Sequence, residues 1–346
     1  MKKISTRQII IFYFIYSFAI KFLILPTFLS MGAGRDAWIA AGAGALFELV
    51  ILFIVLLVIE KKGSVTILMP FMFVFFLVQI LITLAHTNNL LGATLYESRG
   101  RHMFIVPTLV LGLFFIFSKT RAIFRSGEIF YILILIAIFL AVLPALPKVD
   151  ASEVLPVLGG GIMPVLRTVY NNIIYFEGAL VLLMFKGEVA TKKNFKRSFM
   201  IWASVGAVVF TLFVFFYCSL FGPLSSLRQL GIVDVTGQNS YLAQNVRIEW
   251  LIVCVWLLLL LIRFGVLFYC CFVAVRRVTR TEKLHQAWIA FPLAAVVYIG
   301  FMFVPLGGVL NALRIPIAVF IVVVPLLFLI LGGRKCFENS GAKKSG

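Results

Sequence analysis

Unbroken runs of apolar residues recur along the 346-residue chain, and they restrict its fold more than any other feature. A run of roughly 20 apolar residues spans the hydrocarbon core of a bilayer as a helix. Inside a bilayer each backbone amide must be satisfied within its own segment, so helices are the expected form. Charged residues make up only 13% of the chain, which is too few to cover a soluble domain of this length. The sequence therefore predicts an all-α integral membrane protein.

We predict about ten transmembrane helices in one polytopic domain that covers residues 1–346, with a cytoplasmic tail at 333–346. The first apolar stretch follows basic residues, as a signal peptide would, but it contains Lys21 and Pro26 and lacks a small-residue cleavage site. We therefore expect it to be a retained first span. The predicted spans lie near 8–31, 37–60, 67–96, 103–118, 128–146, 165–186, 198–221, 248–275, 286–304 and 312–332.

The distribution of basic residues predicts the orientation of these spans. With the amino terminus placed inside, the cytoplasmic segments hold 21 of the 31 lysines and arginines, and the outer segments hold 7. Cytoplasmic loops of membrane proteins carry an excess of Lys and Arg. The threefold bias indicates that both termini are cytoplasmic. It also accounts for the net charge of +18 without a nucleic-acid partner.

Lys21 lies inside the first predicted span, five residues before Pro26. The proline removes a backbone donor and should open the helix near residue 22, leaving carbonyls free. A charge beside a broken helix is typical of a transporter ligand site. The alternative is a lysine that extends along its own helix to reach the outer interface.

Three further charges lie deep inside predicted spans, where each costs roughly 2.5–3.5 kcal/mol and needs a partner or water. Glu177 is at the middle of the sixth span, next to Gly178, which permits a break or close packing. Glu48 shares a face with small residues of the second span, which favours an internal ion pair over a ligand contact. Arg263 lies too deep in the eighth span to reach either interface, so Glu177 or Glu48 should pair with it.

A polar patch interrupts the third span at residues 86–89, where His86 is followed by Thr87, Asn88 and Asn89. Such side chains hydrogen-bond across helices or line a cavity, and we expect bonding between helices to be the commoner role. One histidine without a second ligand at metal spacing predicts no metal site, and no motif indicates a cofactor. No nucleophile, base or phosphate-loop pattern is present either, so we do not expect an enzyme.

Several segments in order along the chain resemble the spore-germination permease family, the B-type membrane subunit of bacterial germinant receptors. Its relatives belong to the amino acid–polyamine–organocation transporter superfamily. The resemblance extends over most of the chain, and its strongest part is the segment before and within the sixth span. The matching segments are Ile4-Ser5-Thr6-Arg7-Gln8, Leu25-Pro26, Gly34-Arg35-Asp36-Ala37-Trp38, and Leu155-Pro156-Val157-Leu158 with Gly161, Pro164 and the Phe176-Glu177-Gly178 region.

The resemblance implies two inverted five-helix repeats, at about 8–146 and 155–332, with the first and sixth spans broken around a ligand site. Carried over residue by residue, this site comprises Ala19, Lys21 and Phe22 in the first break. In the second break it comprises Tyr175, Phe176, Glu177 and Gly178, with Asn88 and Asn89 facing it. This chain departs from the family pattern because Ala19 and Lys21 stand where many relatives have glycine. The Lys21 ammonium could fill the space of a ligand amine or coupling cation.

These features lead to two functional hypotheses. The first is a germinant-receptor subunit in the spore inner membrane that binds a small nutrient, an amino acid or amine, and signals to A-type and lipoprotein C-type subunits. In this hypothesis Lys21 and Glu177 form a pair that the ligand rearranges. The second is a proton-coupled amino-acid or amine permease with Glu177 or Glu48 as the proton carrier. A scaffold or ion-conducting subunit is a third, ligand-independent alternative.

Overall fold

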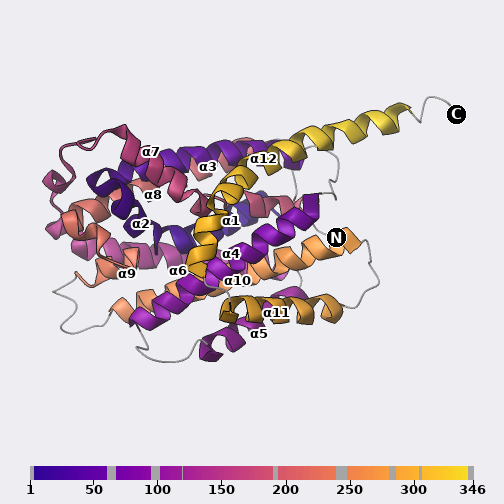
Figure 1. Cartoon of the computed structure of the whole chain (residues 1–346), viewed down its shortest axis with the longest axis horizontal. Helices are drawn as coiled ribbons and strands as arrows, with labels where there is room; N and C mark the ends of the chain where they lie inside the picture. Colours follow the sequence, from indigo (N-terminus) through magenta and orange to yellow (C-terminus); the bar gives the residue numbers. More distant parts are fainter. Residues whose placement is uncertain are drawn as a thin grey trace.

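The computed structural model describes residues 4–60, 68–94, 102–118, 120–189, 194–238, 248–279, 286–303 and 306–341. Within these ranges every regular element is a helix, and the only β-type contact is an isolated bridge between Ile4 and Val189. The helices form an elongated bundle, and α12 extends beyond the others at its C-terminal end (Figure 1). The first part of the chain contains α1 (Thr6–Lys21), α2 (Leu25–Ala33), η1 (Gly34–Asp36), α3 (Ala37–Glu60), α4 (Met69–Thr94), α5 (His102–Phe117), α6 (Thr120–Val142), η3 (Leu143–Lys148) and η4 (Ala151–Val154). The second part contains α7 (Ile162–Asn171), η5 (Ile173–Tyr175), η6 (Leu180–Phe185), α8 (Phe195–Phe221), η7 (Gly222–Ser226), α9 (Gly231–Thr236), α10 (Ile248–Thr279), α11 (Gln286–Phe303) and α12 (Leu306–Gly341).

Seven helices among the described residues are long and apolar enough to cross a membrane, and an eighth is obtained if a pair of bent helices is taken as one span. The bent pair covers Ile162–Asn171 and Ile173–Phe185, at 56° to each other, and Phe104–Phe117 is a shorter apolar helix. Large apolar side chains such as Ile129, Trp288 and Phe303 are exposed on the outside of the bundle, as expected of residues that face lipid. The chain is therefore a multi-pass helical membrane protein. The count of ten spans stays a prediction.

The first helix begins at a capping box. Ser5 Oγ accepts a hydrogen bond from the Gln8 amide at 3.3 Å, and the Gln8 side chain accepts one from the Ser5 amide at 3.3 Å. This reciprocal arrangement satisfies two backbone donors that a helix start leaves open. The polar segment before the first span therefore fixes where α1 begins.

The central helices are arranged around α1. On one side α4 packs along α10, and on another side α3 packs along α8. The short helix α2, which follows α1, packs against both α3 and α7. Gly44 of α3 is required for this packing, because a Cβ atom there would lie 2.2 Å from Cζ of Phe176. The segment around Phe176 thus lies directly against α3, next to Glu48 one turn away.

Candidate functional site

Helical geometry is interrupted just after Lys21, where α1 ends and three residues precede α2. Pro26 has no N–H, so the carbonyl of Phe22, four residues earlier, loses its helical donor. The amide of Ile232, at the start of α9, supplies the missing hydrogen bond at 3.0 Å. The interruption lies where Pro26 led us to expect open carbonyls, and the amide of Ile232 in α9 satisfies one of them.

Two more carbonyls of α1 accept hydrogen bonds from α10. Trp256 Nε1 donates to the carbonyl of Ala19 at 3.1 Å, and Arg263 Nη1 donates to the carbonyl of Tyr16 at 2.8 Å. All four residues are almost fully buried. The last turns of α1 are therefore held by side chains that lie more than 230 positions later in the chain.

The second interruption separates α7 from η6. The chain passes through η5 and then leaves helical geometry around Phe176, Glu177 and Gly178 before η6 begins at Leu180. Gly178 is needed here because a Cβ atom would lie 2.8 Å from Glu48 Oε1 and 3.2 Å from Ser17 Oγ. The two interruptions and α3 thus meet at one place inside the bundle.

Arg263 of α10 pairs with Glu177. This residue was one of the two carboxylates expected to pair with Arg263, because Arg263 lies too deep in its span to reach either interface. Nη2 of Arg263 lies 2.6 Å from Oε1 of Glu177, and both side chains are buried. Tyr16 hydroxyl also donates to Oε1, at 2.9 Å. A buried ion pair needs such extra hydrogen bonds, because the loss of water around both charges offsets much of their attraction.

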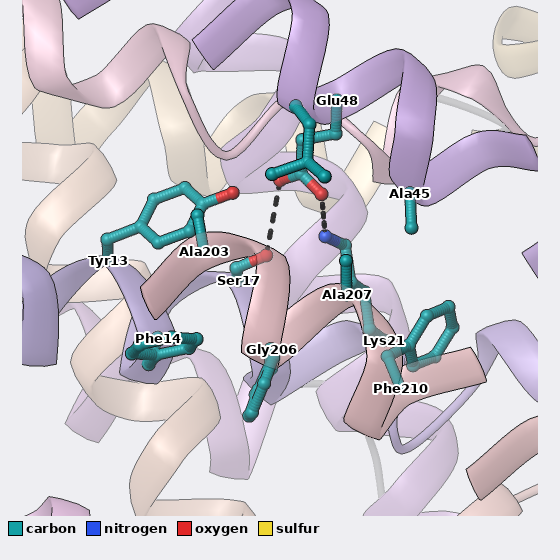
Figure 2. Close-up of a pocket in the computed structure, with 12 residues that line it drawn as sticks. Tyr13, Phe14, Ser17, Lys21, Ala45, Glu48, Ala203, Gly206, Ala207 and Phe210 are labelled. Carbon is teal, nitrogen blue, oxygen red and sulfur yellow. Dashed lines mark hydrogen bonds and ion pairs between the residues drawn. The ribbon is translucent and has the colours of Figure 1, made fainter. Parts of the chain in front are cut away.

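Lys21 pairs with Glu48 of α3, on a neighbouring face of α1. The Lys21 ammonium donates to Glu48 Oε2, and Ser17 Oγ donates to Oε1 at 3.3 Å. The ammonium also lies 5.3 Å from the centroid of the Phe176 ring, within the range of a cation–π contact. Figure 2 shows Lys21 and Ser17 both directed at the Glu48 carboxylate beside a small cavity.

The cavity lies between α1, α3 and α8, and Ala203, Gly206 and Phe210 of α8 form one of its walls. Its volume is about 10 Å³, which is roughly the room that one water molecule needs. In this conformation the pocket beside Lys21 is too small for an amino acid. A ligand of that size requires the surrounding helices or side chains to move.

The expected pair of Lys21 with Glu177 is wrong, because each residue has a different partner. Consecutive residues of an α-helix point about 100° apart, since 3.6 residues make one turn. Ser17 and Lys21, four residues apart, therefore share the face of α1 that meets Glu48. Tyr16 lies on the neighbouring face, which meets Glu177 and Arg263.

The other predicted ligand residues differ in where they lie. Ala19, Phe22 and Phe176 are fully buried at the two interruptions, whereas Tyr175 is half-buried and its hydroxyl lies 3.1 Å from Nε2 of His86. Asn88 is half-buried on α4 and Asn89 is exposed. The buried polar residues of that patch are His86 and Thr87.

Gln79 and Thr83 of α4 contact the site but were not among the predicted residues. Thr83 Oγ1 accepts from Arg263 Nε at 3.3 Å, and Gln79 Oε1 accepts from Arg263 Nη2 at 3.4 Å. Their spacing of four residues within an apolar helix, in line with His86, was a signal that could have found them. Nothing in the sequence indicated Trp256 or Ile232 as donors to α1.

The fold and this site define a class of protein: a multi-pass helical membrane protein with two interrupted helices that meet at buried ion pairs. The family model described as Spore germination protein, a spore permease family, matches residues 3–305. The chain therefore belongs to the spore germination permease family, a family of transporter-like germination proteins rather than of enzymes. No curated protein matches the chain.

Proposed function

We propose that the chain is the membrane subunit of a spore germinant receptor, which binds a small nutrient such as an amino acid and signals germination. The main support is the meeting of the two helix interruptions at the pairs Lys21–Glu48 and Arg263–Glu177. Interrupted helices offer open backbone groups and half-helix dipoles to charged ligand groups. Membership of a germination family supports a signalling role for such a site.

In this proposal the chain forms ten spans in two inverted repeats, at about 8–146 and 155–332. The first span combines α1 with α2, and the sixth combines α7 with η5 and η6. The beginning of α1 and the end of α12 lie toward the same end of the bundle (Figure 1), which supports an even number of spans with both termini in the cytoplasm. The proposed location is the spore inner membrane, with A-type and lipoprotein C-type subunits as partners.

The signal would arise from a change in the ion pairs. The closed pocket beside Lys21 leaves no room for a nutrient, so binding must be accompanied by movement of α1 or of its neighbours α3 and α8. Both interruptions are contacted by α10 or by the outer loop carrying α9. Movement at the site would therefore be transmitted to elements that reach the surface of the bundle.

Germination of spores that carry single substitutions tests this proposal. Glu177→Gln and Lys21→Ala should abolish or strongly reduce nutrient-triggered germination, while germination by a receptor-independent agent stays normal. Glu60→Gln, an exposed carboxylate at the end of α3 and 12 residues from Glu48, is a control for the loss of a carboxylate outside the site and should have no effect. Unchanged germination by both site variants, with normal amounts of protein in the membrane, would refute the assignment.

A proton-coupled amino-acid permease is the second candidate. It is favoured by Oε2 of Glu177, which is buried and has no hydrogen-bond partner among the described residues. A carboxylate oxygen of this kind is suited to carry a proton. Uptake of radiolabelled amino acids into proteoliposomes under a pH gradient separates the two: robust uptake by the chain alone supports the permease, and no uptake supports the receptor.

A further inference from the structure

The guanidinium of Arg263 is held by a set of groups that belong entirely to other elements. Its donors reach Oε1 of Glu177, the carbonyl of Tyr16, Oγ1 of Thr83 and Oε1 of Gln79, at 2.6–3.4 Å. Its Cζ atom lies 4.2 Å from the centroid of the Tyr16 ring. A carboxylate, three further oxygen acceptors and an aromatic face are together the elements of a guanidinium-binding site.

These groups come from both interrupted segments and from α4. Tyr16 is on α1, before the first interruption in the chain, and Glu177 lies within the second interruption. Gln79 and Thr83 are on α4, and only the guanidinium itself comes from α10. The side chain of Arg263 therefore ties α10 to both interrupted helices through non-covalent contacts alone.

The fit of Arg263 in this site is incomplete. Oε1 of Glu177 accepts from both Arg263 and Tyr16, while Oε2 is buried without a hydrogen-bond partner among the described residues. A buried acceptor without a hydrogen-bond partner carries a desolvation cost. A guanidinium that approaches from another direction can bond both oxygens of a carboxylate in parallel. A free guanidinium, unlike one fixed to α10, can adopt that approach.

We propose that this is a receptor site for a small guanidinium-bearing solute, and that Arg263 is its tethered occupant, which the solute displaces. The inference rests on the proposed function, because it specifies the ligand class of the same site. Displacement breaks the hydrogen bonds of Arg263 to α1, α4 and Glu177 in one step. The tethered side chain thus keeps the site closed until a competing solute arrives.

Binding of methylguanidinium to the purified full chain in detergent tests the proposal, with saturation-transfer NMR of the ligand methyl group as the readout. Arg263→Ala removes the occupant and should bind methylguanidinium saturably, but not methylurea, which has the same shape and no charge. The wild type should bind about ten- to a hundredfold more weakly, because a tethered group competes at a high effective concentration. Arg277→Ala, on the same helix, removes a guanidinium that donates to the carbonyl of Met184 and should leave the affinity at the wild-type value.

Three results would overturn the proposal: equal affinity of wild type and Arg263→Ala, equal binding of methylurea, or binding that survives Glu177→Gln in the Arg263→Ala background. If Arg263→Ala aggregates on extraction, methylguanidinium added at extraction should restore a monodisperse peak in size-exclusion chromatography. A variant that stays aggregated at every concentration refutes the proposal as well. These measurements need no germination assay, so their failure is distinct from a failure of the receptor assignment.

Discussion

Removal of one member of the Lys21–Glu48 pair should destabilise the protein far more than removal of both. Lys21→Met leaves the Glu48 carboxylate buried with two neutral hydroxyls, those of Ser17 at 3.3 Å and of Tyr13, as polar neighbours and no positive charge paired with it. An uncompensated buried charge of this kind costs about 3–5 kcal/mol. Glu48→Gln leaves the Lys21 ammonium over the Phe176 ring, 5.3 Å from its centroid, and this contact retains about 0.5–2 kcal/mol. We therefore expect Glu48→Gln to be the milder of the two variants.

The double variant Lys21→Met/Glu48→Gln contains no unpaired charge and should lie within about 1–2 kcal/mol of the wild type, because neutral replacements of a buried pair are often tolerated. The coupling energy, which is the sum of the two single losses less the loss of the double variant, is then at least about 2 kcal/mol and about 5 kcal/mol at the middle of these ranges. The middle value exceeds the roughly 0.5–3 kcal/mol usual for residues in contact. The free energies are measured by reversible unfolding of the purified protein with SDS in mixed micelles. Additive effects, with a double variant less stable than either single one, would refute the account of Lys21 and Glu48 as a mutually neutralising pair.

Two further substitutions test the geometry around the site. Gly178→Ala should cost about 1–3 kcal/mol in the same unfolding measurement, because its Cβ atom would lie 2.8 Å from a Glu48 oxygen. Gly92→Ala is the control: a Cβ atom there has no atom within 4 Å, so this variant should not be destabilised. Equal losses in the two variants would contradict this packing. Asp36→Ala removes the carboxylate that accepts from the Leu158 amide at 2.7 Å, and a hydrogen bond to a charged group contributes about 1.5–3 kcal/mol. Limited proteolysis should then cleave the segment 155–161, which contains Leu158, about tenfold faster or more, and an unchanged cleavage rate would show that this bond does not hold the segment.

The helix interruptions were the part of the site that the sequence indicated best, because their causes are local. Pro26 removes one specific hydrogen bond, and the effect falls on a carbonyl four residues earlier whatever surrounds it. The depth of Arg263 in an apolar run likewise required an acidic partner. Such conclusions need only the chain on either side of the residue.

The choice of partners could not be predicted in the same way. Lys21 and Glu177 lie in the two interrupted segments, but pairing depends on which face of α1 meets which neighbour. That rotation is set by contacts such as Phe14 against Gly206 and Ser17 against Gly178, between residues more than 160 positions apart. The helix ends were also approximate: the span expected at 312–332 is part of a longer helix, Leu306–Gly341.

The hydrogen bonds from Trp256 and Arg263 to the carbonyls of α1 have a consequence for biosynthesis. The first helix leaves the ribosome long before its two donors on α10 are translated. Lys21 and Glu48, only 27 residues apart, can neutralise each other as soon as the first helical hairpin enters the bilayer. Glu177 must instead wait for Arg263, so a nascent chain arrested before α10 holds an unmatched carboxylate in the membrane. Chains truncated at residue 247 should therefore be degraded faster in cells than full-length chains, and Glu177→Gln should lengthen their half-life.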